Sequence, residues 1–265
     1  MNQSQPLLKT GLTPSASGSA YLEIKREHPS DTTSGGLSPR PSGLKLTCAV
    51  HGPRPLPRSA PFSPQLLLST KVKFTPFANG HQRGFMPDSD ERDLAAHLET
   101  ALKGTLLAER WPKSGVDVVI TVLEGEEGSP SSSSNGSCDH LTLLSSCITV
   151  ASAAIADAGI DCVDVATGGV AAIVLGASGR SQLILDPCPS DHQSVGRACV
   201  VAYLQARDEV TEVWAKQEGE PPGADGSEHS DFLSLVDGAV EAAKAARLVL
   251  MDTLKESVEA KLRRD

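Results

Sequence analysis

Side chains that could act as a nucleophile and a base lie close together at one place in the sequence. Ser145 and Ser146 follow His140 closely, but a serine nucleophile also needs a third group that orients the histidine. The neighbouring sequence supplies no such residue, so we predict that both serines pack a buried helix. The other histidines are scattered, mostly in predicted loops, and we interpret them as surface residues: His28, His51, His81, His97, His192 and His229.

The sequence contains no motif that indicates a metal or cofactor site. The cysteines form no CxxC pair and no cysteine–histidine cluster at zinc spacing. Glu124, Glu126 and Glu127 stand beside a serine-rich stretch, and a solvated loop does not preorganise carboxylates around a cation. Residues 1–20 are polar and predict no signal peptide. We therefore expect no metal, no cofactor and an intracellular protein with free thiols at Cys48, Cys138, Cys147, Cys162, Cys188 and Cys199.

Two further motifs have structural interpretations. Gly168-Gly169, in VATGGVAAIV, lacks the lysine and the serine or threonine of a phosphate-binding P-loop. We predict that this pair forms a bulge or turn between strands. Asp186 ends the apolar run LILDP, and we predict a turn there.

Basic residues are the candidates for contact with nucleic acid. The chain has a formal net charge of -9, and an acidic protein binds nucleic acid poorly on its own because Lys and Arg supply most of the non-specific affinity. The segment GPRPLPR places Arg54 and Arg58 on a stiff proline-rich loop. Lys71 and Lys73 share one face of the next predicted strand. Ordinary surface charge is the alternative interpretation of the two arginines.

The pattern of apolar residues predicts a layered α+β fold. Hydrophobic residues make up 39% of the chain and aromatic residues only 3%, which favours a sheet with closely packed helices over an aromatic-rich sandwich. Helical spacing predicts helices over residues 88–109, 140–158 and 231–262. Alternating or β-branched runs predict strands over residues 20–26, 44–51, 65–75, 116–123, 162–175, 181–186, 198–204 and 210–216.

We expect one domain, because the elements show no repeat and no composition break. Residues 1–16 predict a flexible N-terminal arm, and the domain then spans residues 17–262. Low-complexity insertions occupy residues 27–42 and 124–138. Residues 52–61 hold several prolines, so we predict that they end the preceding strand and form a loop. No apolar run approaches the ~18 residues of a membrane span.

Several segments, taken in order, resemble the RNase PH family over residues 17–262. LKLTCAVHGPRP is similar to that family's second strand and its exit, and WPKSGVDVVITVLEG is similar to a helix-to-strand junction. HLTLLSSCITVASAAIADAGI and VDVATGGVAAIV resemble its long buried helix and the strand that follows. EVTEVWAKQEGEP resembles the strand before the last helix. The resemblance implies an RNase PH-like fold with mixed sheets packed against helices.

Active members of the family phosphorolyse RNA 3′ ends with three features that this sequence has lost. An arginine of the first helix falls on Ala96, and the GG-[ST]-R turn that holds phosphate falls on residues 141–144, with Leu144 in the place of its arginine. The catalytic aspartate of a later strand falls on Arg197. Leucine cannot donate hydrogen bonds to phosphate, and arginine cannot replace a carboxylate. The resemblance therefore implies a protein that is not an enzyme.

Inactive family members occur in the eukaryotic RNA exosome, and the resemblance implies the same setting here. Six RNase PH-like subunits form a hetero-oligomeric ring, which carries cap subunits and passes RNA to an associated ribonuclease. The implied role is structural, in rRNA maturation and mRNA turnover, in the nucleus, nucleolus and cytoplasm and without a membrane partner. The resemblance places Arg54 and Arg58 near the mouth of the RNA channel, with Lys71, Lys73 and Arg83 as further candidates.

Two alternatives stay open from the sequence. The chain could be an active phosphate-dependent 3′–5′ exoribonuclease that works with a partner, and release of nucleoside diphosphates from RNA in phosphate buffer would indicate this. It could also be an unrelated α+β scaffold protein, which a stable monomer without homologous partners would favour.

Overall fold

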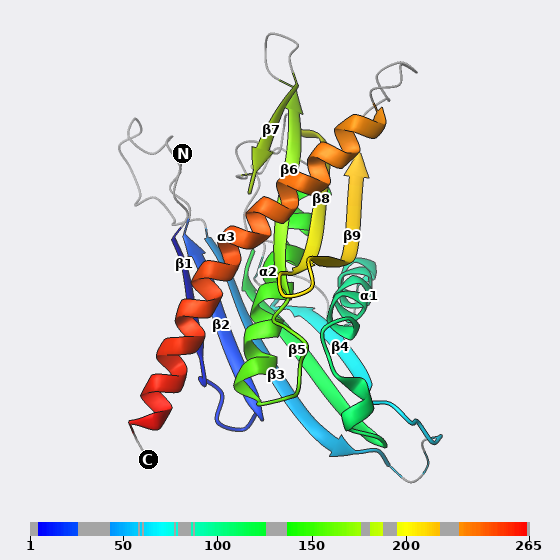
Figure 1. Cartoon of the computed structure of the whole chain (residues 1–265), viewed down its shortest axis with the longest axis vertical. Helices are drawn as coiled ribbons and strands as arrows, with labels where there is room; N and C mark the ends of the chain where they lie inside the picture. Colours follow the sequence, from blue (N-terminus) through cyan, green and yellow to red (C-terminus); the bar gives the residue numbers. More distant parts are fainter. Residues whose placement is uncertain are drawn as a thin grey trace.

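Two β-sheets enclose a layer of helices in the computed structural model (Figure 1). The first sheet is five-stranded in the order β1-β2-β3-β5-β4, and the second is four-stranded in the order β7-β6-β8-β9. The structure describes residues 5–25, 43–57, 59, 61–76, 78, 86, 88–125, 137–175, 181–187, 195–217 and 228–263.

Among the strands that the structure describes, pairing is antiparallel except between β4 and β5. These two strands are parallel and are connected through helix α1, the usual solution for parallel neighbours. The strands are β1 (Gln5–Thr10), β2 (Gly18–Lys25), β3 (Gly43–Pro55), β4 (Leu67–Phe74), β5 (Ser114–Glu124), β6 (Thr167–Leu175), β7 (Ser181–Leu185), β8 (Val195–Leu204) and β9 (Glu209–Gln217).

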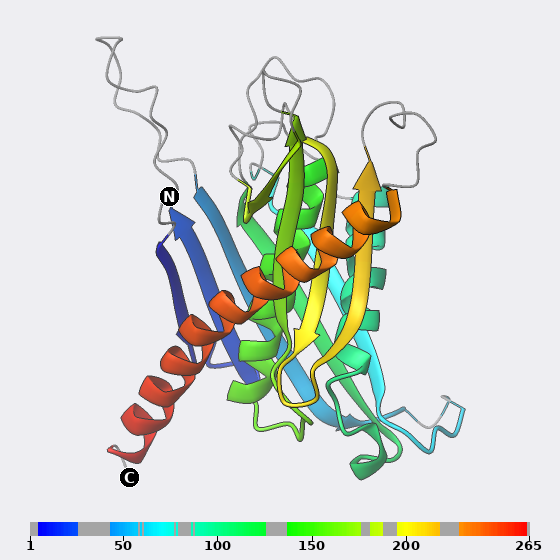
Figure 2. The same cartoon turned by 45° about the horizontal axis from the view of Figure 1, so that its top comes forward.

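Helices α1, α2 and α3 occupy two layers. Helix α2 (Ser137–Asp157) lies between the sheets, against β2 and β3 on one side and β6 and β8 on the other. Helix α1 (Ser89–Lys103) packs against β4, β9 and α2. Helix α3 (Glu228–Leu262) crosses the outer face of the second sheet and reaches β1 (Figure 2). The order of sheet, helices, sheet and helix confirms the predicted α+β fold.

Helix α2 is apolar all round because both of its sides are covered. Leu144, Ile148 and Ile155 are among its fully buried side chains. The stretch Cys138–Asp157 is long and apolar enough to cross a membrane, but 83% of its apolar window is buried inside the protein, as in the core helix of a soluble fold. Gly159 follows the helix with a φ of +70°, the left-handed conformation that glycine commonly adopts just past a helix end.

Gly168 and Gly169 let two helices approach strand β6 from opposite faces. A Cβ on Gly168 would lie 2.2 Å from the Ser145 carbonyl oxygen of α2, and one on Gly169 would lie 2.0 Å from the Ala239 carbonyl oxygen of α3. Successive residues of a strand face opposite sides, so this pair sets the spacing of both helices. The predicted bulge or turn is wrong, because both glycines lie inside β6 in regular pairing with β8.

A strand lies within the range predicted as a flexible arm, residues 1–16, of which residues 1–4 lie outside the described part of the chain. Gln5–Thr10 forms β1, which pairs with β2 along its whole length. Leu8 is 6% exposed and joins the core, and the Thr10 hydroxyl donates a hydrogen bond to Ser257 Oγ of α3 at 2.8 Å. The apolar run in this segment is too short to indicate a strand, and the pairing with β2 and α3 holds it in place.

Strand β3 continues through Pro55, past the end predicted at residue 51. The β3–β5 register shifts between His51 and Arg54, so the proline at position 53 falls in an irregularity where no ladder hydrogen bond is needed. Gly52 has a φ of +139°, and a Cβ there would lie 2.7 Å from the Gly115 carbonyl oxygen. Glycine is therefore required at this bend.

Other boundaries move by a few residues. The helix predicted over residues 88–109 ends at Lys103 with Gly104 as its C-cap, and a 3-10 turn follows at Ala108–Arg110. The strand predicted from residue 162 begins only at Thr167, and Cys162 forms an isolated bridge with Leu106 instead. The insertion predicted over residues 27–42 and most of that over 124–138 lie outside the described residues.

Candidate functional site

Three of the basic candidates lie on the outer face of the first sheet, turned away from the helices. Arg54 of β3 and Lys71 and Lys73 of β4 are paired with alternate residues of β5. The residues of β5 between these partners, such as Val118 and Ile120, are fully buried against the core. Because side chains alternate along a strand, the three cations project from the opposite, open face.

Arg54 is already paired on this face. Its guanidinium donates a hydrogen bond to Asp117 Oδ2 of β5, and the two side chains are 60% and 41% exposed. The carboxylate offsets the charge that Arg54 would offer to a phosphate. His51 lies opposite Asp117 in the same strand pair.

The lysines do not form one cluster with Arg54. Arg54 lies opposite Gly115 and Lys71 lies opposite Val119, which places them about 13 Å apart along the strand direction at about 3.3 Å per residue. Lys71 and Lys73 are both exposed, on either side of buried Val72, as predicted for one face of a strand. Arg58 and Arg83 lie outside the described residues.

The segment to which the resemblance assigns the phosphate-holding turn is helical here. Helix α2 begins at Ser137, so residues 141–144 lie in its second turn, where backbone N–H groups bond to carbonyl groups of the preceding turn. Leu141 and Leu144 are both fully buried. Residues 141–144 therefore offer a phosphate neither a cation nor unpaired backbone donors.

The position that the resemblance assigns to the helix arginine is Ala96, an exposed residue of α1. Its neighbour His97 stacks on Trp214 of β9 with ring centroids 4.1 Å apart. His97 Nδ1 also lies 2.7 Å from Glu212 Oε1, and Lys216 Nζ lies 4.5 Å from the Trp214 ring centroid. This part of α1 holds the helix against β9.

The position that the resemblance assigns to the catalytic aspartate is Arg197, a half-buried residue of β8. It lies between Ile173 of β6 and Gln217 of β9 in the second sheet. If the alignment that the resemblance implies holds, a cation stands where active family members have a carboxylate. Arg197 stays, with Ala96 and Leu144, one of the three positions at which the resemblance predicts the loss of a catalytic side chain.

The serine–histidine spacing does not form a nucleophilic pair. His140 Nε2 lies 3.9 Å from Asp90 Oδ2 at the start of α1, and Ser145 and Ser146 lie further along α2. Within the described ranges, we find no group of three or more His, Cys, Asp or Glu residues that could hold a metal ion.

Burial also makes four of the described cysteines poor nucleophiles. It raises the pKa of Cys147 to about 12 and those of Cys162 and Cys199 to about 11. The pKa of Cys48 is raised further still by burial and by the neighbouring Cys147. These thiols stay protonated near neutral pH. They are free, as is Cys138, which agrees with the prediction for these five residues.

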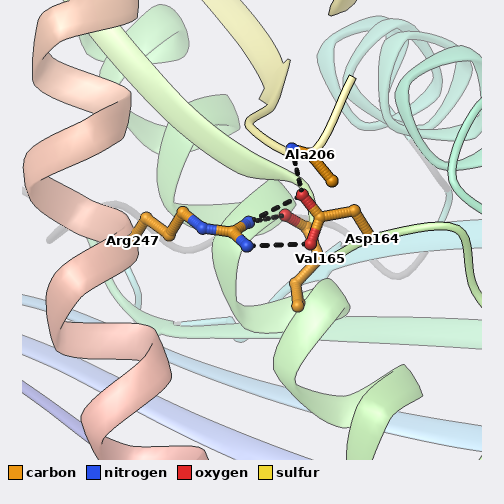
Figure 3. Close-up of polar contacts among 4 residues, drawn as sticks. All are labelled: Asp164, Val165, Ala206 and Arg247. Atoms are coloured by element: carbon orange, nitrogen blue, oxygen red, sulfur yellow. Dashed lines mark hydrogen bonds and ion pairs between the residues drawn. The ribbon is translucent and has the colours of Figure 1, made fainter. Parts of the chain in front are cut away.

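One charged cluster gave no signal in the sequence (Figure 3). Arg247 of α3 donates hydrogen bonds from Nη1 and Nη2 to the two carboxylate oxygens of Asp164, each at 2.9 Å, and Nη1 also donates to the Val165 carbonyl oxygen at 3.1 Å. The Ala206 N–H donates to Asp164 Oδ2 at 2.9 Å. The cluster joins α3, the segment between α2 and β6, and the turn between β8 and β9.

Asp164 stays ionised in this cluster. Burial acts to raise its pKa, but the hydrogen bonds from Arg247 and from backbone N–H groups outweigh this and hold the pKa below its ordinary value. The side chains of Arg247 and Asp164 are only 15% and 8% exposed. The two residues are 83 positions apart, so no local spacing could reveal the pair.

Comparison with known proteins identifies relatives over nearly the whole chain. Residues 6–161 match the family model described as "3' exoribonuclease family, domain 1" (RNase_PH). The exosome complex component MTR3 of Chaetomium thermophilum is 50% identical over 253 residues, which cover 95% of this chain and 84% of that protein. The exosome complex component mtr3 of Schizosaccharomyces pombe is 28% identical over 249 residues, 93% of this chain and 81% of that protein.

A solved structure shares the fold. The crystal structure of rice (Oryza sativa) Rrp46 superposes with a TM-score of 0.68 over 96% of each chain, at 16% sequence identity. This likeness confirms the predicted RNase PH-like architecture. The segments WPKSGVD and HLTLLSSCIT most resemble the exosome subunit called the mRNA transport regulator, and the two MTR3 relatives confirm that prediction.

Proposed function

The chain belongs to the 3′ exoribonuclease (RNase PH) family, and we propose that it is a non-catalytic structural component of the RNA exosome. The observation that carries the proposal is the 50% identity to an exosome component, MTR3, over 95% of the chain. Membership of the family also removes the alternative of an unrelated α+β scaffold protein.

The loss of catalysis is supported by the three aligned positions. Phosphoryl transfer requires groups that hold phosphate and neutralise its charge. Ala96 supplies no cation, Leu144 is buried within helix α2, and Arg197 replaces a carboxylate with a cation. No single substitution carries this argument, since each of the three removes a different part of the chemistry.

The proposed partners are other RNase PH-like subunits in a six-membered ring, cap subunits and an associated ribonuclease. Exposed leucines on the outer face of the first sheet fit contacts with such neighbours: Leu7, Leu67 and Leu123 are 42%, 53% and 41% exposed. Apolar side chains at the centre of a contact supply much of the energy of stable assembly.

Passage of RNA is the proposed role of the basic residues. Lys71 and Lys73 are exposed on the open face of the first sheet, and Arg54 reaches the same face paired with Asp117. Arg58 and Arg83 are further candidates. The proposed localisation is the nucleus, nucleolus and cytoplasm. The proposed processes are rRNA maturation and mRNA turnover.

Native mass spectrometry of a complex purified from cells through this chain tests the assembly. The expected result is a particle that contains several RNase PH-like subunits. The same preparation and the isolated chain are then incubated with RNA in phosphate buffer. The expected result is no phosphate-dependent release of nucleoside diphosphates by the isolated chain, and their release would overturn the non-catalytic role.

A further inference from the structure

Two segments meet where β3 ends and β5 begins, in the lower part of Figure 1: the one that follows β3 and the turn that precedes β5. The Leu66 N–H of the first segment donates to the Ala108 carbonyl oxygen of the second at 2.9 Å. Each segment carries an exposed aromatic side chain, since Phe62 and Trp111 are 69% and 37% exposed. Phenylalanine is among the residues most often buried, and tryptophan is enriched at interfaces. The two rings therefore indicate a contact surface.

Lys113 is held beside the Phe62 ring. Its Nζ lies 5.1 Å from the ring centroid, within the range of a cation–π contact. The Lys113 N–H donates to the Ser63 carbonyl oxygen at 3.2 Å, and the Lys113 carbonyl oxygen accepts from the Leu56 N–H at 3.0 Å. Its φ is +59°, a conformation that is uncommon for residues other than glycine. The segment after β3 thus fixes a lysine beside an exposed ring at some cost in backbone strain.

The charge of Lys113 is not neutralised by a carboxylate. Arg54 and Arg110 are each paired with an aspartate, whereas Lys113 makes no ion pair with any residue that the structure describes. Glu109 is the exposed acidic residue of the same turn. Arg54, a proposed RNA contact, lies opposite Gly115, two residues beyond Lys113. The rings therefore lie at one end of the face on which RNA contacts are proposed.

Exposed rings beside cations are the combination with which proteins bind single-stranded nucleic acid, because bases stack on the rings and phosphates meet the cations. We propose that Phe62, Trp111 and Lys113 form a base-stacking site for single-stranded RNA. The site rests on the proposed passage of RNA and adds contacts with the bases to those with the phosphates. A neighbouring protein chain is the alternative occupant, and the experiments below separate the two.

Two oligonucleotides separate stacking from charge. Fluorescence anisotropy at low salt measures binding of the full chain to oligoadenylate and to an abasic oligonucleotide of the same length, which keeps the phosphates alone. Phe62→Ala is expected to weaken oligoadenylate binding by about tenfold and to leave abasic binding unchanged. Phe62→Tyr keeps a ring and is expected to bind like the wild type. Equal weakening for both oligonucleotides in Phe62→Ala, or no measurable oligoadenylate binding by the wild type, would overturn the site.

Lys113→Asn tests the cation, because asparagine removes the charge and tolerates the left-handed conformation. It is expected to weaken the binding of both oligonucleotides and to reduce the slope of log K against log salt concentration by about 0.7. Phe232→Ala removes a ring of similar exposure to Trp111, 40%, from the start of α3. This control is expected to bind both oligonucleotides like the wild type. An unchanged salt slope in Lys113→Asn would remove Lys113 from the site.

Native mass spectrometry of the complex that carries Phe62→Ala distinguishes this site from the proposed function. The expected result is an unchanged subunit content together with weaker oligoadenylate binding. Loss of a subunit with unchanged oligoadenylate binding would assign the rings to a protein contact and overturn the site, while membership of the exosome would stand. A wild-type chain that purifies without RNase PH-like subunits would instead overturn the proposed function.

Discussion

Two arginine–aspartate pairs that each connect distant parts of this chain differ in their exposure to solvent: one is buried and the other lies at the surface. The Arg247–Asp164 pair is bidentate, with side chains 15% and 8% exposed, and receives a further hydrogen bond from Ala206. The Arg54–Asp117 pair lies on an open sheet face, with side chains 60% and 41% exposed. The residue types are the same, but the first pair is largely shielded from water and the second is exposed to it.

The difference separates a structural ion pair from an available one. Removing one partner of a buried pair leaves a charge that neither water nor protein compensates, so the loss is large. An exposed pair is screened by solvent and contributes about 0–1 kcal/mol. We infer that Arg247–Asp164 holds α3 in place, whereas Arg54 can exchange its aspartate for another anion at little cost in stability.

The largest expected effect comes from Arg247→Ala. The substitution leaves Asp164 buried without its cation and is expected to lower the free energy of unfolding by about 3–5 kcal/mol. Urea denaturation followed by circular dichroism measures this. Lys244→Ala, which removes an exposed ion pair with Glu241 on the same helix, is the control, and its expected effect is much smaller because solvent screens an exposed pair. Similar losses in both variants would remove the distinction between buried and exposed pairs.

Gly169→Ala tests whether close backbone packing against β6 also holds α3 in place. The new Cβ would lie 2.0 Å from the Ala239 carbonyl oxygen, and the expected loss of unfolding free energy is about 3 kcal/mol. Gly238→Ala is the matched control, because its Cβ would meet side-chain atoms and no backbone: the flexible ends of Leu183 and Leu185 at 3.0–3.1 Å and the Ala171 Cβ at 3.3 Å. Within helix α3 that change is expected to be neutral or to stabilise by up to about 1 kcal/mol. A tolerated Gly169→Ala would mean that α3 can shift on the sheet.

The pH dependence of stability isolates the carboxylate of the buried pair. Because the folded-state pKa of Asp164 is lowered, its contribution is fully present above the unfolded value of about 3.9 and is lost as the pH falls through the folded pKa. Urea denaturation between about pH 5 and pH 2 is expected to show a steeper loss of stability in the wild type than in Asp164→Asn. Equal slopes would show that Asp164 does not couple folding to protonation.

Arg54→Ala has the smallest expected effect on stability, under about 1 kcal/mol. A change at this position is expected to affect the binding of RNA by the assembled complex instead. Protection of RNA from nuclease by the assembled complex is expected to fall in Arg54→Glu, while the subunit content by native mass spectrometry stays the same. Asp117→Asn, which frees Arg54 from its partner, is expected to strengthen that protection. Unchanged protection in both variants would remove Arg54 from the RNA path.

The sequence predicted those elements whose pattern is local. The periodicity around Leu144 and Ile148 identified the buried helix, and the alternation around Lys71 and Lys73 identified a strand with one exposed face. Glycine and proline were harder to interpret. Gly168-Gly169 and the Gly52 bend both lie inside strands, since a neighbouring backbone or a register shift, neither visible along the sequence, decides their role.

The candidate site was predictable as a set of residues but not as an arrangement. Family resemblance pointed to Ala96, Leu144 and Arg197, and helix α2 explains why residues 141–144 cannot hold phosphate. Spacing could not show that Asp117 pairs with Arg54, because strand register decides which residues meet. The Asp164–Arg247 pair depends in the same way on long-range contacts.

Helix α3 follows every other described element along the chain, so a ribosome makes it after the sheet that it covers. Until Leu235 and Ala239 emerge, the apolar side chains of Ala171, Cys199 and Val201 on the second sheet have no cover. The newly made sheet thus presents an apolar surface of the kind that chaperones bind. The fold is complete only when the last helix has been made. A messenger RNA truncated before the codon for residue 228 would therefore yield a chain prone to aggregation rather than a smaller stable protein.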